Sequence, residues 1–131
     1  MKIDRGKVHS KYDGHCGYCG KEITIKEMQV DHMIPKSAVY YQLRKDENAI
    51  EKIHCFDNLM PTCRRCNHYK RADNIEQFRI SMKDLHKRLE KIYINKVALD
   101  FGMIEIKPFN GIFYFEQILY LFHIEKLVSK K

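Results

Sequence analysis

The chain has 131 residues, 44% of them hydrophobic, which suits one domain with an appendage. Its formal net charge is +7, and residues 61–96 carry ten basic and four acidic side chains, so most of the excess lies there. This segment favours a polyanionic partner such as nucleic acid, although a solvated surface would have the same composition. No apolar run approaches the ~18 residues of a membrane span, so we expect no membrane partner.

The first residues, Met1 to Arg5, are charged, and no apolar run follows them. This pattern is not that of a secretory signal. We therefore expect a cytoplasmic protein, in which thiols stay reduced and paired cysteines bind metal more often than they form disulfides.

The first half of the chain predicts short elements. Residues 4–12 suit a helix with Val8 and Tyr12 on its inner face. The stretch from Ile23 to Asp31 alternates loosely in polarity and suits one arm of a β-hairpin. Residues 36–57 are polar and irregular, with a helical turn expected around residues 38–43.

Two Cys-x-x-Cys pairs are present, Cys16 with Cys19 and Cys63 with Cys66. Two pairs at this spacing are typical of a tetrahedral zinc site with four thiolates. A redox pair or a disulfide framework is the alternative, and the expected cytoplasmic location disfavours the disulfides. Cys55 has no partner at this spacing and lies in an apolar context, so we expect a buried small residue rather than a ligand.

A helix is predicted to begin within residues 67–71, and Asp73 or Asn74 suits the N-cap of the next one. That next helix carries apolar residues at alternating spacings of four and three: Phe78, Met82, Leu85, Leu89 and Ile92. Such a stripe favours packing onto its own domain, and a coiled-coil dimer has only about two heptads of support.

The last third predicts a hairpin and a closing helix. Residues 103–109 and 112–116 are apolar segments joined by Asn110-Gly111, a pair that favours a type I′ turn. The stretch from Gln117 to Val128 is apolar and aromatic, and we interpret it as a packed helix, with a partner surface as the alternative.

Further motifs lie between and after the cysteine pairs. Asp31-His32-Met33-Ile34-Pro35 and then Asn58-Leu59 separate the pairs, and Asn67 and Lys70 follow Cys66. A carboxylate beside a histidine on a zinc clip indicates a catalytic centre. In this order the motifs resemble the HNH endonuclease family in its four-cysteine form, over about residues 8–75. The resemblance implies a ββα-metal fold and phage- or restriction-like cleavage of double-stranded DNA.

The resemblance also implies roles for single residues. His32 is the general base, for which a near-neutral imidazole is suited. Asp31 and Asn67 hold a catalytic Mg²⁺ or Mn²⁺, ions that prefer hard oxygen ligands. Asn58 holds the loop and orients His32 through a hydrogen bond. Asn67 stands where the family often has its last histidine, and its harder oxygen favours magnesium over nickel or zinc. His68 points about 100° away on the helix, so we do not assign this role to it.

The basic residues after the second cysteine pair are the predicted DNA contacts. Lys70 lies one turn beyond Asn67, and a second row follows on one face of the long helix, where a solvated face is the alternative. The full set is Arg64, Arg65, Lys70, Arg71, Arg79, Lys83, Lys87 and Lys91. His15 and His54 flank cysteines and are expected to be structural or solvent-facing.

The sequence therefore predicts an α+β protein. Residues 1–75 form an HNH nuclease core with structural Zn²⁺ on the four cysteines, and residues 76–131 form a helix-plus-hairpin extension packed on that core. An inactive, zinc-stabilised nucleic-acid-binding module is the alternative function, and a zinc clip for protein contacts is a third. The intact Asp31-His32 pair favours the enzyme, because binding alone needs neither residue. Monomer and homodimer both remain open.

Overall fold

A computed structural model describes residues 2–38 and 48–129. The helical turn predicted around residues 38–43 lies outside them, apart from Ala38. The chain divides into two compact units, Met1–Asn74 with Phe113–Lys131, and Ile75–Ile112. Sequence analysis placed all of residues 76–131 in one extension, whereas the segment from Phe113 clusters with the first unit. The packing of an extension on a nuclease core stays a prediction.

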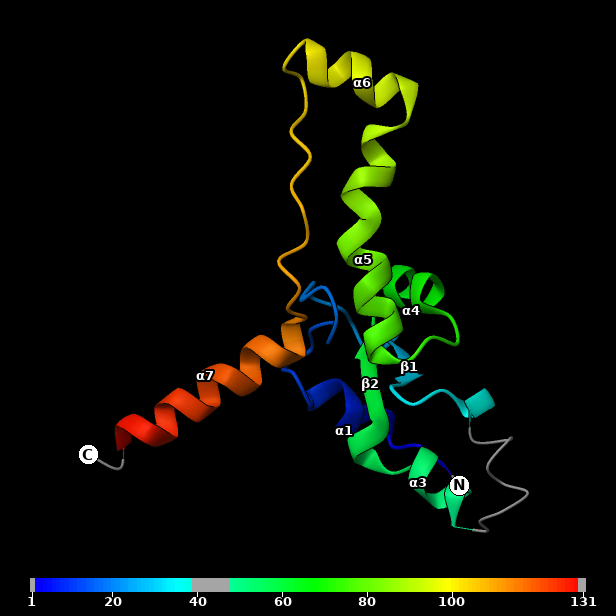
Figure 1. Cartoon of the computed structure of the whole chain (residues 1–131). Coiled ribbons are helices and arrows are strands. Elements are labelled where there is room, and N and C mark those ends of the chain that lie inside the picture. Colours follow the sequence, from blue (N-terminus) through cyan, green and yellow to red (C-terminus); the bar gives the residue numbers. More distant parts are fainter. Residues whose placement is uncertain (1, 39–47, 130–131) are drawn as a thin grey trace. The chain divides into compact units, whose positions relative to one another are not determined.

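The first unit combines short helices with a two-stranded sheet (Figure 1). Its elements are α1 (Arg5–Ser10), β1 (Gln29–His32), α3 (Ala49–Ile53), the 3₁₀ helix η1 (Phe56–Asn58), β2 (Leu59–Thr62), α4 (Arg64–Lys70) and α7 (Tyr114–Ser129). This mixture confirms the predicted α+β class. The helix predicted after the second cysteine pair begins earlier than expected, inside the pair.

Helix α1 forms within the predicted range and is held at both ends, but it ends at Ser10, so Tyr12 lies in the turn that follows. The Asp4 carboxylate accepts a hydrogen bond from the Lys7 backbone N–H at 3.1 Å, which caps the helix N-terminus. Val8 is buried. After the helix, Lys11 Nζ donates to the carbonyl oxygens of Phe56 and Leu59 at 3.0 and 2.8 Å. These bonds join the start of the chain to the beginning of β2.

Strands β1 and β2 are antiparallel, with Asp31 opposite Met60 and His32 opposite Leu59. The predicted arm at residues 23–31 therefore becomes a strand only from Gln29 onwards. Consecutive strand residues point to opposite faces, so Asp31 and His32 face different sides of this sheet. Because α4 follows β2 almost directly, the order β1, β2, α4 gives the ββα arrangement that the family resemblance implied.

The first Cys-x-x-Cys turn lies against β2 and against the start of α7. Gly17 N–H donates to the Pro61 carbonyl at 2.8 Å, and a Cβ on Gly17 would lie 2.0 Å from Met60 Sδ. The Tyr18 ring meets Phe113 and Phe115 edge-on, with centroids 5.5 and 6.3 Å apart. These contacts form the core beneath the cysteine cluster.

The second unit contains α5 (Ile75–Glu90) and α6 (Tyr93–Asp100), followed by a segment that returns along α5 (Figure 1). The predicted apolar stripe is shorter than expected. Phe78 is buried, but α5 ends at Glu90, and Ile92 is 49% exposed in the break before α6. The bounds of α5 agree with the N-cap expected at Asn74.

The predicted C-terminal hairpin is wrong, because residues 103–113 contain no strand and α7 begins at Tyr114. Asn110 Oδ1 accepts a hydrogen bond from the Ile112 N–H at 2.9 Å, and only Gly111 has a positive φ, so no type I′ turn forms. Glu116 Oε1 accepts from the Phe113 N–H at 3.0 Å, which caps a helix where a strand was expected. The predicted closing helix forms, but the expectation that it is packed fails for residues 119–129, which are all exposed. No helix in the described ranges is long and apolar enough to cross a membrane.

Candidate metal and nuclease site

The four paired cysteines come together in the first unit. The Sγ atoms of Cys16, Cys19, Cys63 and Cys66 all lie within 4.8 Å of one another, and Cys19 Sγ is 3.9 Å from Cys63 Sγ. Zn–S bonds of about 2.3 Å in a tetrahedron place the sulfur atoms roughly 3.8 Å apart. The donor set and its spacing therefore fit a structural zinc ion.

Each cysteine pair is positioned by its own turn. In the first pair, Gly20 N–H donates to the Cys16 carbonyl at 2.9 Å, and Gly20 has a φ of +80°, which glycine adopts without strain. In the second pair, Cys63 is the N-cap of α4, and its Sγ accepts from the Cys66 N–H at 3.4 Å. The second turn is therefore also the start of the helix that carries Asn67.

The thiols influence one another's ionisation. Hydrogen bonds from Cys16 and Cys66 lower the pKa of Cys19 to about 3. Hydrogen bonds with Cys16 and Cys19, and then burial, raise the pKa of Cys66 well above its ordinary value. A first thiolate forms readily in the cluster, but its negative charge opposes the ionisation of the remaining thiols. A bound divalent cation is what allows all four to ionise.

Cys55 does not take the position expected from the sequence. It was predicted to be a buried small residue, but it is exposed, and it forms the N-cap of η1 without a side-chain hydrogen bond. The apolar context of the sequence was misleading because its neighbour Phe56 is also 46% exposed. Cys55 is not one of the thiols that cluster, which agrees with the expectation that it is not a ligand.

Asp31 is buried at the centre of a polar cluster. Tyr18 Oη donates to Asp31 Oδ2 at 2.6 Å, and Lys70 Nζ lies 3.0 Å from the same oxygen. Burial, with the charge of Asp31 next, raises the pKa of Tyr18, so the phenol stays protonated and donates. Lys70 is fully buried and also donates to the His32 carbonyl at 3.2 Å. Lys70 was expected to touch phosphate, but its ammonium group is enclosed here and paired with Asp31.

Helix α4 lies on the face of β1 that carries Gln29 and Asp31. Asn67 Nδ2 donates to Gln29 Oε1 at 2.7 Å, and Lys70, three residues later, reaches Asp31, two residues after Gln29. Within the described residues, neither Asp31 Oδ1 nor Asn67 Oδ1 accepts a hydrogen bond. One hard oxygen on each side chain is therefore available for a divalent cation, so this pair fits the ligand set that the family resemblance implied.

His32 lies on the other face of β1 and is 9% exposed. Its Nε2 is 3.4 Å from His54 Nδ1, and the two rings are nearly perpendicular, at 80°. Burial lowers the pKa of His32, and the charges of Lys36 and His54 lower it further. The imidazole is therefore neutral at neutral pH, which is the form that accepts a proton. His54, expected to be structural or solvent-facing, is the direct neighbour of this ring.

Asn58 holds the loop that follows His32. Its Oδ1 accepts from the Ile34 N–H at 2.8 Å, and its Nδ2 donates to the carbonyl oxygens of Ile34 and Ile53 at 3.2 and 2.9 Å. Sequence analysis expected it to orient His32 through a hydrogen bond. No such bond joins the two side chains among the described residues, so any influence on His32 passes through the loop backbone.

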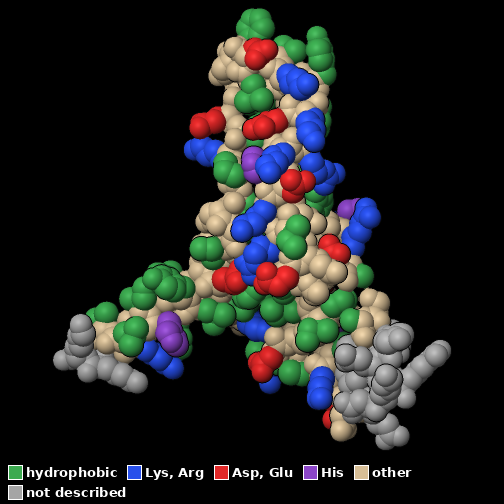
Figure 2. Space-filling model, in the orientation of Figure 1, with side chains coloured by type: hydrophobic (Ala, Val, Ile, Leu, Met, Phe, Trp, Pro, Cys, Tyr) green, Lys and Arg blue, Asp and Glu red, His purple; other side chains and the backbone are tan. Residues whose placement is uncertain are grey.

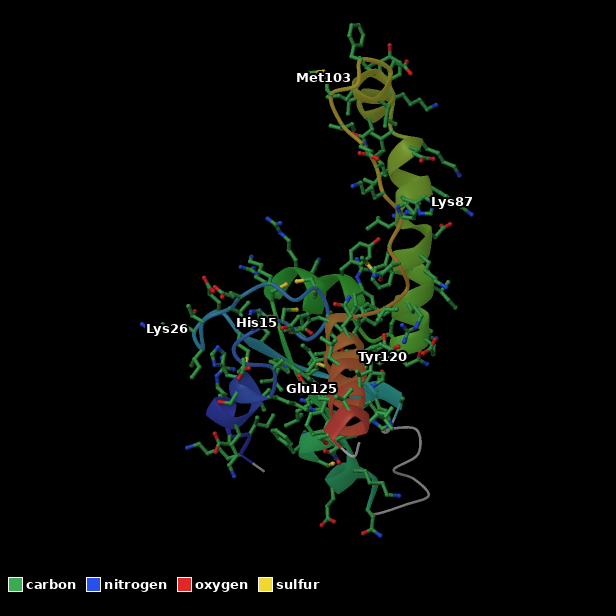
Figure 3. All side chains as sticks on the ribbon, turned by 90° about the vertical axis from the view of Figure 1, so that its left-hand side faces the viewer. His15, Lys26, Lys87, Met103, Tyr120 and Glu125 are labelled. Atoms are coloured by element: carbon green, nitrogen blue, oxygen red, sulfur yellow. The ribbon has the colours of Figure 1, made fainter. Side chains whose placement is uncertain are left out.

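The predicted DNA contacts separate into exposed and enclosed residues. Arg79 is mostly buried and donates to the Glu76 carboxylate and to the Gly111 carbonyl, so its charge is already partnered. Lys87 points away from α5 into solvent (Figure 3). The exposed members of the set are Arg64, Arg65, Arg71, Lys83, Lys87 and Lys91.

Sequence analysis missed a basic groove beside the zinc cluster. The groove has a volume of about 400 Å³ and is lined by Lys21, Ile23, Lys26, Glu27, Gln29, Cys63 and Arg64. Figure 3 shows Lys26 projecting from this part of the first unit. Gln29 connects the groove to Asn67 through the 2.7 Å hydrogen bond. Both lysines follow the first cysteine pair in the sequence, and this proximity is the signal that could have identified them.

The fold and the site define a zinc-clipped ββα domain with a carboxylate and an imidazole on adjacent strand residues. Residues 16–73 match the family model described as HNH endonuclease. The match covers all four cysteines, Asp31, His32, Asn58 and Asn67, and confirms the resemblance found in the sequence. The similarity of residues 16–73 to this family supports a nuclease-type function that acts on nucleic acid. No curated protein and no solved structure matches the chain.

Proposed function

We propose that the protein is a metal-dependent DNA endonuclease that hydrolyses phosphodiester bonds, with His32 as general base. The observation that carries the proposal is the arrangement on β1. A neutral imidazole occupies one face, and a carboxylate occupies the other, where it shares an interface with Asn67 on α4. A protein that only bound nucleic acid would need neither group.

His32 acts on the attacking water. His32 Nε2 lies 3.4 Å from His54 Nδ1, and in the tautomer in which His32 Nε2–H donates to His54, the Nδ1 lone pair of His32 takes the proton. His54 is thus a positioning residue that fixes the tautomer of the base. Asn58 holds the following loop through Ile34, which limits rotation of the strand end that carries His32. General-base catalysis of this kind contributes about 10²- to 10⁴-fold to a rate.

Asp31 and Asn67 would hold the catalytic divalent cation through their remaining oxygens. A bound Mg²⁺ or Mn²⁺ supplies charge neutralisation at the scissile phosphate and stabilises the leaving 3′-oxygen. The oxygen-only pair favours magnesium or manganese over softer metals. Zinc on the four cysteines has a separate, structural role, since the cluster leaves no open coordination position.

The proposed substrate is double-stranded DNA. The groove formed by Lys21, Lys26 and Arg64 adjoins Gln29, so a backbone phosphate in it would lie next to the residue that Asn67 contacts. Arg65 on α4 and Arg71 directly after it are also exposed and available for phosphate contacts. Phosphate contacts of this type supply affinity and register without reading sequence.

An inactive, zinc-stabilised nucleic-acid-binding module is the second candidate. The ion pair between Lys70 and Asp31 favours it, because the ammonium group already neutralises the carboxylate that would bind the metal. The two candidates differ in whether metal can bind beside this ion pair through Asp31 Oδ1.

Cleavage of a labelled DNA duplex by His32→Ala distinguishes the candidates. We expect a loss of roughly 10²- to 10⁴-fold in the single-turnover rate, with unchanged duplex affinity and unchanged zinc content. His68→Ala is the matched control, because His68 is an exposed histidine on α4. Equal rates for wild type and His32→Ala would show that His32 is not the general base. Equal losses in His32→Ala and His68→Ala would show that the loss is not specific to His32.

A further inference from the structure

The outer part of α7 is apolar and uncovered. Every residue from Leu119 to Ser129 is exposed. Seven of them are large hydrophobic side chains, with exposed fractions between 39% and 67%: Leu119, Tyr120, Leu121, Phe122, Ile124, Leu127 and Val128. Figure 2 shows hydrophobic side chains gathered along this helix, and Figure 3 shows Tyr120 and Glu125 projecting from it.

This surface is too apolar for a helix in water. At successive turns of 100° the apolar residues fall on every side of α7, and a helix that is hydrophobic all round is normally buried. An isolated helix of about this length is only marginally stable without packing. At ~200 Å² per large side chain, the exposed fractions sum to roughly 800 Å², more than the largest apolar patch of a typical monomer. A partner is therefore required to cover it.

We propose that α7 is a homodimerisation helix, and that its partner is a second copy of this chain. An exposed apolar area of roughly 800 Å² equals what each partner contributes to a standard stable interface. Residues 114–129 contain only Glu116, Glu125 and Lys126 as charged residues. Two copies can thus meet at α7 without the repulsion that a chain of charge +7 would meet elsewhere. A two-fold axis places identical patches against each other, and Glu125 and Lys126 offer complementary charges across it.

Sedimentation velocity of the zinc-loaded full chain, without DNA or added magnesium, tests the proposal. We expect a concentration-dependent species of twice the 15.7 kDa chain mass. Leu121→Glu and Leu127→Glu should each raise the dimer dissociation constant about 100-fold, because each would bury an unpaired carboxylate. Both side chains are exposed, so zinc content and helicity should stay unchanged.

Ile80→Glu is the matched control, since Ile80 is 68% exposed on α5 and should leave the dimer intact. Wild type that stays monomeric up to about 100 μM overturns the proposal. An Ile80→Glu variant that dissociates as readily as Leu121→Glu does the same. Monomers that float with phosphatidylcholine vesicles would show that a lipid surface covers α7 instead. None of these outcomes depends on whether the protein cleaves DNA.

A second inference concerns Tyr18 and rests on the proposed function. Tyr18 lies inside the first cysteine pair, and its hydroxyl donates to Asp31 Oδ2 at 2.6 Å. Phe113 and Phe115 fix its ring from the sides. We infer that Tyr18 is a positioning residue that holds Asp31 through Oδ2, leaves Oδ1 for a metal ion, and couples the zinc turn to this carboxylate. Partners of this kind are worth about 10- to 100-fold in metal affinity.

Electron paramagnetic resonance titration with Mn²⁺, on zinc-loaded protein without DNA, tests this role. Tyr18→Phe keeps the ring packing, and we expect it to raise the Mn²⁺ dissociation constant about tenfold. Tyr12→Phe is the control, because no hydrogen bond of the described residues uses the Tyr12 hydroxyl. If Asp31→Asn weakens Mn²⁺ binding but Tyr18→Phe does not, the positioning role is wrong. If Asp31→Asn has no effect either, the metal assignment of the proposed function fails with it.

Discussion

The buried ion pair between Lys70 and Asp31 gives the sharpest prediction of stability. Lys70→Met keeps most of the length and volume of the side chain but removes the ammonium group. That group is fully buried, 3.0 Å from Asp31 Oδ2 and 3.2 Å from the His32 carbonyl oxygen. The substitution leaves a carboxylate that is 8% exposed, with the Tyr18 hydroxyl as its remaining side-chain donor among the described residues. An uncompensated buried charge costs about 3–5 kcal/mol.

Thermal and urea unfolding of the zinc-saturated protein measure this cost. We expect Lys70→Met to lower the Tm by roughly 10–20 °C. Asp31→Asn combined with Lys70→Met should be less destabilised than the two single changes predict, by at least about 1 kcal/mol, because both charges are then absent. Lys87→Met is the control, since Lys87 is exposed on α5. A Lys70→Met cost below about 1 kcal/mol, or strict additivity in the double variant, would refute the pairing.

Two more predictions concern zinc and DNA affinity. Cys63→Ser should release zinc, measured by a colorimetric chelator, and lower the Tm severely. Cys55→Ser should change neither the zinc content nor the Tm, because Cys55 is exposed and outside the cluster. Equal damage from both variants would show the ligand assignment to be wrong. A triple variant replaces three exposed lysines on and just after α5 with glutamine, at Lys83, Lys87 and Lys91. It should flatten the salt dependence of duplex binding by up to about 0.9 log unit per lost phosphate contact. Arg79→Gln should leave that slope unchanged, because Glu76 already pairs with Arg79. An unchanged slope in the triple variant would show that Lys83, Lys87 and Lys91 form a solvated face that does not contact DNA.

The sequence predicted those parts of the site that local spacing determines. The cysteine pairs, the adjacent Asp31 and His32, and the helix after the second pair are short motifs whose geometry follows from a few neighbouring residues. Their convergence on one cluster is confirmed for the thiols. The predicted roles of Asp31, His32 and Asn67 remain proposals, which the contacts around β1 and α4 support.

The sequence could not predict features that depend on tertiary contacts. Lys70 reads as a surface cation, but packing of α4 on β1 encloses it against Asp31. Arg79 belongs to a regular basic row in the sequence, yet its guanidinium group donates a hydrogen bond to the Gly111 carbonyl of the returning segment. The Asn110-Gly111 pair suggested a hairpin because of its turn preference. The hairpin does not form because the capping contact of Glu116 with the Phe113 N–H competes with strand formation, and local turn preference alone does not reveal that competition.

Metal-dependent cleavage of supercoiled plasmid tests the central claim most directly. Purified zinc-loaded wild type is incubated with the plasmid in magnesium, manganese, cobalt or nickel, and in a chelator that spares the structural zinc. The account predicts open-circular or linear product with magnesium or manganese, and none with the chelator. Plasmid that is bound but stays supercoiled in all four metals would contradict the account and establish the protein as a binding module.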